Sequence, residues 1–230
     1  MCFSYGADLT AAAVLTPVGI VTLRAAKTRA QLPIASIPLF FAAHQFVESF
    51  VWLGVGHHAS KGVESFAIYL YLVMAQMLLP VIVPLAISAV EPVQRRRQWM
   101  YASAVGGFVS AAAFGYILVT QGATAHAADR TMIYKTPTDL GLWAGALYAN
   151  ATVLTTLYAS GRNLRLFGVA NILGISMASW MRWEAVTSVW CIYAAFVSGL
   201  ILLHLNELNA SRGTPPRGRV SDADTPPLPA

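Results

Sequence analysis

The chain has 230 residues, of which 57% are hydrophobic and 11% are charged. Soluble domains carry about 25% charged residues, so this composition excludes a soluble globular protein and indicates a membrane protein. The net charge of +5 does not indicate a nucleic-acid partner, because the basic residues are scattered over loops that flank apolar segments. With only two cysteines, Cys2 and Cys191, a disulfide framework is also excluded.

Seven apolar segments are long enough to cross a bilayer. In chain order they cover roughly residues 8–26, 32–55, 65–90, 99–120, 140–160, 164–181 and 185–206. They predict an all-α, polytopic membrane protein in which residues 1–207 form one seven-helix transmembrane bundle. Residues 208–230 are rich in proline and polar residues, and this composition predicts a disordered cytoplasmic tail.

The basic residues predict the orientation, because cytoplasmic connections retain Lys and Arg. One side of the membrane receives eleven of them: Arg24, Lys27, Arg29, Arg95, Arg96, Arg97, Arg162, Arg165, Arg212, Arg217 and Arg219. The other side receives four, which are Lys61, Arg130, Lys135 and Arg182. The N-terminus is therefore expected outside and the C-terminus in the cytoplasm.

The second span contains the strongest candidate for a functional site. His44 and Glu48 are four residues apart, so both side chains lie on one face of the predicted helix. By helical rise they lie roughly 18 and 24 Å from the cytoplasmic end. A carboxylate near the centre of a bilayer costs about 2.5 to 3.5 kcal/mol, so we interpret Glu48 as part of a functional site that faces the bundle interior.

The third span contains two prolines, Pro80 and Pro84. Each lacks the N–H that the carbonyl four residues earlier would accept, namely the carbonyls of Gln76 and Pro80. We expect polar side chains or water to replace these donors. Such kinked helices form binding sites in some transporters and only improve packing in other proteins, and both alternatives remain open.

The longest connection, Gln121 to Asp139, lies between the fourth and fifth spans on the outer side. It contains His126, Tyr134 and Lys135. Connections of this length are either lids and binding loops or mobile linkers.

Three amide side chains lie on other spans at depths similar to that of His44. They are Gln76, Asn150 and Asn171. Because polar groups in a bilayer prefer the bundle interior, we predict that these amides and the His44 and Glu48 side chains line one pocket for protons or a small ligand. The alternative is that each amide only joins a pair of helices.

A metal site is a second interpretation of the same residues. His44 and Glu48, together with Cys2, would suit zinc or copper, but zinc requires at least three protein ligands and His204 lies too far toward the cytoplasmic end. A second set of metal-ligating residues could gather at the outer mouth: Cys2, Asp8, His57, His58, Glu64, His126 and Glu184. The alternative is that the adjacent loop histidines, His57 and His58, are only solvated. We interpret His204 and Glu207 as a cap of the last helix.

Retinal is excluded as a cofactor, because its Schiff base needs a lysine within the last span. The only lysines are Lys27, Lys61 and Lys135, and all three lie in predicted loops.

Several short motifs near the N-terminus occur together: Met1-Cys-Phe-Ser4, Thr22-Leu-Arg24, Leu32-Pro33, and His44-Gln-Phe-Val-Glu48 with Trp52. Over about residues 1–55 the chain resembles an uncharacterised family of bacterial integral membrane proteins that begin with Met-Cys-Phe-Ser. The resemblance implies a multi-pass protein of the bacterial inner membrane with Cys2, His44 and Glu48 as signature positions. It implies no activity.

Three functions are consistent with these observations. The first is a protein that binds a small ligand, or couples protons to transport or sensing, through His44 and Glu48. The second is a metal-dependent intramembrane enzyme, and the third is an accessory subunit of a larger membrane complex. The expected partners are the lipid bilayer and either a small-molecule ligand or another membrane protein.

Overall fold

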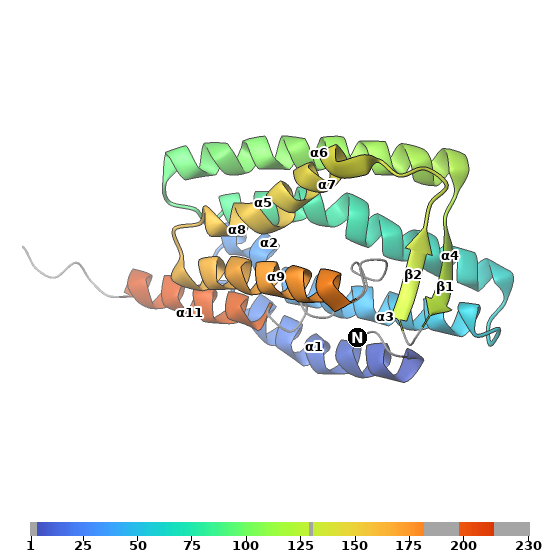
Figure 1. Cartoon of the computed structure of the whole chain (residues 1–230). Helices are drawn as coiled ribbons and strands as arrows, with labels where there is room; N and C mark the ends of the chain where they lie inside the picture. Colours follow the sequence, from blue (N-terminus) through green and yellow to red (C-terminus); the bar gives the residue numbers. More distant parts are fainter. Residues whose placement is uncertain (1–3, 129–130, 182–197, 214–230) are drawn as a thin grey trace, which may run out of the picture.

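The computed structural model describes residues 4–128, 131–181 and 198–213, and it is mostly helical (Figure 1). The first four predicted spans are confirmed as helical segments that are long and apolar enough to cross a membrane. These segments are α1 (Tyr5–Ala25); η1 (Arg29–Gln31), α2 (Leu32–Ala35) and α3 (Ile37–Val55); α4 (Lys61–Leu72), η2 (Val73–Leu78) and α5 (Leu79–Ser88); and α6 (Gln94–Gln121).

The second half of the chain is also helical where it is described. It contains α7 (Gly141–Ala149), η3 (Asn150–Leu154), α8 (Thr155–Leu157), α9 (Arg162–Met181) and α11 (Gly199–Gly213). These elements coincide with the fifth and sixth predicted spans and with the end of the seventh, whose first part lies outside the described residues. Crossing of the membrane by these three segments stays a prediction.

α11 extends to Gly213, into the segment that the sequence predicts as a tail. Asn209 gives a physical reason, because its side chain joins α11 to the end of the first helix. The Asn209 Nδ2 donates to the carbonyl of Ala25 at 2.8 Å, and the Asn209 Oδ1 accepts a bond of 3.1 Å from Gln31.

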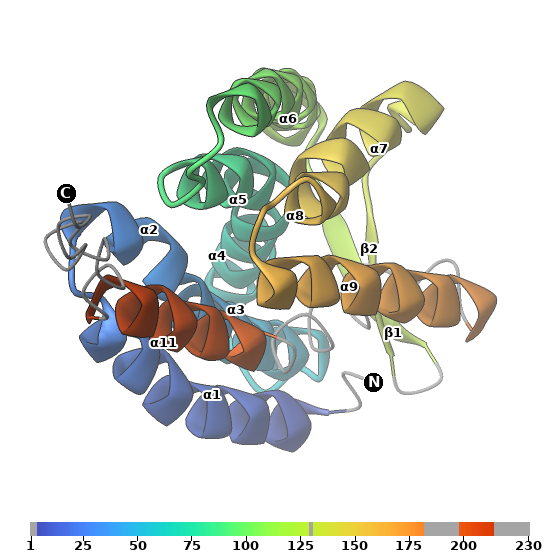
Figure 2. The ribbon, with the colours of Figure 1, turned by 90° about the vertical axis from the view of Figure 1, so that its left-hand side faces the viewer.

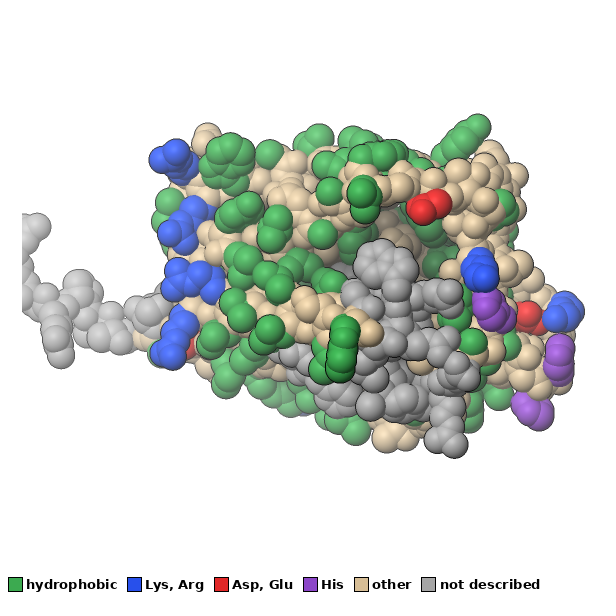
Figure 3. Space-filling model, in the orientation of Figure 1, with side chains coloured by type: hydrophobic (Ala, Val, Ile, Leu, Met, Phe, Trp, Pro, Cys, Tyr) green, Lys and Arg blue, Asp and Glu red, His purple; other side chains and the backbone are tan. Residues whose placement is uncertain are grey.

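Consecutive helical segments lie side by side and run in opposite directions (Figures 1 and 2). Figure 3 shows Lys and Arg side chains gathered at the end of the bundle where α6 and α9 begin, with hydrophobic side chains in the middle. We call this the basic end. The histidines visible in this view lie at the opposite end, which we call the hairpin end.

Two apolar clusters form the core. The basic-end cluster is built of Leu15, Ile34, Ala35, Ile37, Phe41, Ala42, Leu79, Val83, Ala86, Ile87, Met100, Val153, Ala159, Leu164, Ile201 and Leu205. The hairpin-end cluster is built of Val51, Ala67, Ile68, Tyr71, Leu72, Ala75, Leu118 and Met132. On α3 the first cluster ends at Ala42 and the second begins at Val51. The residues between these two positions therefore lie between the two apolar clusters.

The prolines of the third span change the helix register. Val73–Leu78 is a π-helix, and the N–H of Leu79 donates to the carbonyl of Met74, five residues earlier. In this π register the residue that would donate to the carbonyl of Ala75 is Pro80, which has no N–H. The Tyr148 hydroxyl donates to that carbonyl instead, at 2.9 Å. The expectation that a polar side chain would replace the donor was correct, but the carbonyl concerned is that of Ala75 and not that of Gln76.

The carbonyl freed by Pro84 is that of Pro80, and it faces Gly107 of α6. A Cβ atom at Gly107 would collide with this carbonyl oxygen. Glycine therefore allows the backbone of α6 to approach the kinked segment closely.

The connection between α6 and α7, which the sequence left open as a lid, a binding loop or a mobile linker, forms a β-hairpin within the otherwise helical structure. Strands β1 (Thr124–Ala128) and β2 (Thr131–Lys135) pair antiparallel, with Thr124 opposite Lys135. The hairpin crosses the end of the bundle from α6 toward α3 (Figure 1). Its β2 residues are buried from Thr131 to Ile133, and β1 contacts α3 and α4. Burial of an apolar strand on the bundle explains why this segment folds.

Candidate functional site

A layer of polar side chains lies on α3 between the two apolar clusters. His44, Gln45, Glu48 and Ser49 all have 0% exposure. Spacings of three and four residues place these groups on the buried side of one helix. His44 and Glu48, the pair singled out from the sequence, are thus both inside the protein.

Glu48 is contacted by a residue from the hairpin. The hydroxyl of Tyr134 on β2 donates a hydrogen bond of 3.3 Å to Glu48 Oε1. The ring of Tyr134 stacks on Tyr71 of α4, with 4.3 Å between ring centroids and 8° between ring planes. The ring of Tyr71 also lies against that of His44, with 4.2 Å between the two ring centroids. His44 and Glu48 are therefore joined through two tyrosines from two other elements.

Three polar side chains of this layer have atoms that are available to a ligand. Within the described part of the chain, neither amide atom of Gln45 makes a well-formed hydrogen bond, and the His44 ring has a contact with the backbone of Tyr71 that falls short of one. The indole N–H of Trp52, one turn beyond Glu48, also makes none there. Buried polar groups normally bind a partner, so these atoms can donate to and accept from a water molecule or a polar ligand.

The three amides that the sequence assigns to the same pocket lie in other elements. Gln76 is half-buried in η2. Asn150 in η3 donates to Ser103 Oγ on α6 at 3.1 Å, and Asn171 in α9 donates to the carbonyl of Phe167 at 2.8 Å. The bond of Asn150 joins two helical segments, as the alternative interpretation expects. One pocket formed by all five side chains stays a prediction.

The metal interpretation has no further support among the residues that are placed. In that part of the chain no three His, Cys, Asp or Glu side chains gather closely enough to hold a metal ion. Cys2 and Glu184 lie outside the described residues, and Asp8 is fully buried in α1. Glu64 pairs with Lys61 at 2.8 Å, while His57, His58 and His126 are exposed. Binding of zinc or copper stays a prediction.

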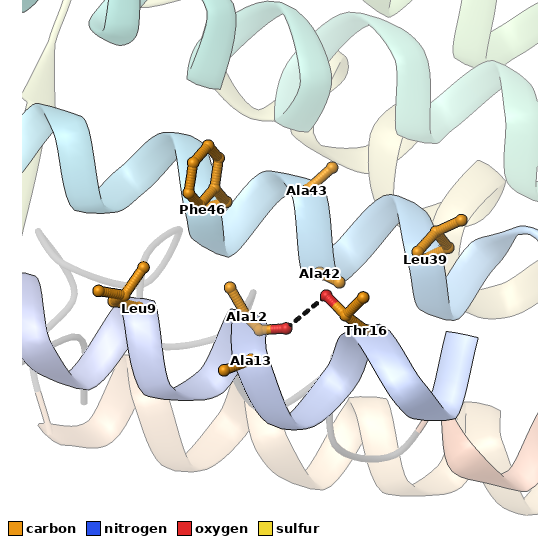
Figure 4. Close-up of a pocket in the computed structure, with 8 residues that line it drawn as sticks. All are labelled: Leu9, Ala12, Ala13, Thr16, Leu39, Ala42, Ala43 and Phe46. Carbon is orange, nitrogen blue, oxygen red and sulfur yellow. Dashed lines mark hydrogen bonds between the residues drawn. The ribbon is translucent and has the colours of Figure 1, made fainter. Parts of the chain in front are cut away.

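A groove of about 370 Å³ lies between α1 and α3 (Figure 4). Its lining is mainly apolar: Leu9, Ala12, Ala13, Thr16, Leu39, Ala42, Ala43 and Phe46. The only hydroxyl among them, that of Thr16, donates to the carbonyl of Ala12 at 2.7 Å. This groove offers no polar group for recognition of a polar ligand, so it is distinct from the site around Glu48.

A second buried polar cluster lies at the basic end. Glu91, 5% exposed, accepts hydrogen bonds from the Ser160 N–H at 2.8 Å, from the Ser160 hydroxyl at 2.5 Å and from the Val93 N–H at 3.1 Å. His204 on α11 is 4% exposed, and its ring lies against Gly161. The sequence assigns His204 to a helix cap with Glu207, whereas the structure buries it. Glu91 was missed, although an acidic residue just before three arginines was a usable signal.

Tyr71 and Tyr134 were also missed as site residues. Tyr71 gives no signal in the sequence, because an aromatic residue in an apolar span is ordinary. Tyr134 was named as part of the long outer connection, which the sequence left open as a lid, a binding loop or a mobile linker, but it was given no role at the site.

Comparison with known proteins finds no curated protein and no solved structure that matches the chain. One family model, described as a family of unknown function, matches residues 1–216. The match extends from the N-terminal motifs to the end of α11 and thus includes all of the elements described above. The chain therefore belongs to DUF6629, a family of unknown function.

Proposed function

We propose that this protein binds protons at Glu48 inside the membrane and couples their binding to transport or sensing, with His44 and Gln45 available to a small polar ligand. The observation that carries the proposal is the hydrogen bond of 3.3 Å between Tyr134 and Glu48. It connects a fully buried carboxyl group to a segment of the outer connection. A carboxyl group with such a link can respond to conditions outside the bilayer.

The chemistry of the surroundings suits a reversible proton site. Burial in a low-dielectric environment favours the uncharged form of a carboxyl group, whereas a hydroxyl donor favours the charged form. Glu48 experiences both influences, because it has 0% exposure and accepts from Tyr134. Ionisable groups within membrane helices commonly mark proton relays and substrate pathways.

The proposal includes a topology of seven spans in the bacterial inner membrane, with the N-terminus outside. Two observations support it. The helical segments alternate in direction, and the Lys and Arg side chains gather at one end of the bundle (Figures 1 and 3). With the basic end in the cytoplasm, the hairpin and the site around Glu48 lie toward the outside.

Infrared spectroscopy of the protein in lipid vesicles tests the proton site directly, because a protonated carboxyl group has its own C=O stretching band. We expect a pH titration of the native protein to show a buried carboxyl band that the Glu48→Gln variant lacks. Glu64→Gln is the matched control, since Glu64 is paired with Lys61 in a salt bridge. An identical set of carboxyl bands in native protein and in Glu48→Gln would refute the proposal.

A further inference from the structure

We infer that the hairpin β1–β2 is a lid over the Glu48 site, held closed by Tyr134. This inference rests on the proposed function, since it concerns access to the same site. It assigns the outer connection a mechanical role: the hairpin opens the site to the outside and closes it again.

Two glycines bound the segment that would move. Gly122 follows the last residue of α6 and has φ 79°, and Gly141 is the first residue of α7 and has φ 72°. Glycine adopts positive φ without the steric cost that other residues bear, so the chain turns sharply at both ends of the connection. The Thr138 hydroxyl donates to Gln121 Oε1 at 2.6 Å and so ties the end of the connection to the last residue of α6. Antiparallel pairing from Thr124 with Lys135 to Ala128 with Thr131 holds the two strands together, so the hairpin can move as one body between these turns.

Both strands contribute contacts that hold the hairpin closed. Met132 and Ile133 have 0% and 3% exposure, and Met132 belongs to the hairpin-end cluster with Val51 of α3. Tyr134 adds its stack on Tyr71 and its hydrogen bond to Glu48. On β1, Ala125 packs against the same cluster, and the strand contacts α3 and α4. Separation of β2 from the bundle would uncover Tyr71 and Glu48 together.

Tyr134 is the residue that links lid closure to the site. Its ring and its hydroxyl make different contacts, the ring with Tyr71 and the hydroxyl with Glu48. Tyr134→Phe removes only the hydrogen bond, whereas Tyr134→Ala removes both contacts. The two variants should therefore open the lid to different extents.

Labelling of a buried cysteine measures this opening. In a background with Cys2→Ser and Cys191→Ser, Val51→Cys places a thiol beneath the hairpin at a position with 0% exposure. A cationic, membrane-impermeant methanethiosulfonate is added to the outside of vesicles. Loss of one hydrogen bond corresponds to roughly a fivefold change in an equilibrium, so we expect labelling to be about fivefold faster with Tyr134→Phe and faster still with Tyr134→Ala. Tyr116→Phe, at a residue that is 69% exposed on α6, should leave the rate unchanged.

A second thiol separates lid opening from unfolding. Leu205→Cys lies in the basic-end cluster with 0% exposure. It is compared with Val51→Cys in mild detergent, where the reagent reaches both ends of the protein, and it should stay unlabelled in every variant. If Tyr134→Phe and Tyr134→Ala label Val51→Cys no faster than the native tyrosine does, the lid is refuted. Labelling of both thiols at equal rates in these variants would also refute it, because the hairpin would then have no motion of its own.

The result of the cysteine labelling is independent of the result of the infrared test. Faster labelling in the Tyr134 variants without a Glu48 carboxyl band would support the lid and overturn the proton site. A Glu48 carboxyl band, together with equal labelling rates of Val51→Cys in the native protein and in the Tyr134 variants, would support the proton site and overturn the lid.

Discussion

The hydroxyl of Tyr148 on α7 donates a hydrogen bond of 2.9 Å to the carbonyl oxygen of Ala75 in η2. This carbonyl has lost its helical donor, because Leu79 donates to Met74 and Pro80 has no N–H. In a bilayer no bulk water is present to replace a missing donor, so a side chain from a neighbouring helix takes that role. The relationship explains how a proline-containing segment with a π register is tolerated inside the bundle.

Tyr148→Phe should therefore destabilise the protein. The substitution leaves the Ala75 carbonyl without its tyrosine donor, which costs about 1 to 3 kcal/mol for a buried group. Thermal unfolding in mild detergent, followed by fluorescence-detected size exclusion, measures the effect. Tyr101→Phe is the control, since Tyr101 is 48% exposed on α6 and its loss of a hydroxyl should leave the unfolding midpoint unchanged. Equal midpoints for the two variants would contradict the prediction.

Gly107→Ala should be among the most damaging single substitutions in α6. The added methyl group meets the backbone carbonyl of Pro80, which cannot rotate away, and overpacking of this kind costs about 1 to 3 kcal/mol. The same unfolding assay measures the loss. Gly145→Ala provides the comparison, because no atom lies within 4 Å of a Cβ at that position. A Gly107→Ala protein as stable as Gly145→Ala would show that the two helices are farther apart than described.

Asn209→Ala should loosen the end of α11. It removes the hydrogen bonds of Asn209 to Ala25 and Gln31, each of which contributes about 0.5 to 1.5 kcal/mol. Hydrogen exchange followed by mass spectrometry should show faster exchange at this end of α11. Asn206→Ala removes an exposed amide from the same helix and should have little effect. Similar exchange rates in both variants would argue against docking of α11 through Asn209.

Glu91→Gln tests the polar cluster at the basic end. A neutral amide presents one acceptor oxygen in place of two, and charged acceptors contribute about 1.5 to 3 kcal/mol per hydrogen bond. We expect a lower unfolding midpoint, because Glu91 joins the α5–α6 connection to Ser160 before α9. Glu207→Gln, at an exposed position of α11, is the control. If both variants unfold at the native temperature, these hydrogen bonds contribute nothing measurable.

Local composition was sufficient to predict the helices of the first half. The apolar runs that contain α1, α3, α4 with α5, and α6 leave little choice, since a chain in a bilayer must satisfy its backbone hydrogen bonds within each segment. The same apolar context identified His44 and Glu48 as candidate site residues that face the bundle interior. Their burial follows from the cost of a polar group in lipid.

Local sequence patterns could not identify the residues that contact these side chains in the fold. Tyr134 reaches Glu48 across 86 positions of sequence, and Tyr148 reaches Ala75 across 73. Such contacts depend on how whole helices are arranged. The hairpin was missed because a search for membrane spans assigns no secondary structure to the connections between them. Thr131, Ile133 and Tyr134 are nevertheless typical strand residues. The π register was missed because a proline indicates a break in a helix without fixing how the break is repaired.

The hairpin also bears on how the chain is assembled during synthesis. Met132 belongs to the hairpin-end cluster, but it lies after α6 in the sequence. With the topology proposed above, that cluster is incomplete until the outer connection has been translocated and has folded back onto α3 and α4. Until then, Glu48 lacks its hydrogen bond from Tyr134, and the Ala75 carbonyl of the third span lacks its hydrogen bond from Tyr148. With that topology, the final packing of the first four helices depends on segments that follow them in the chain.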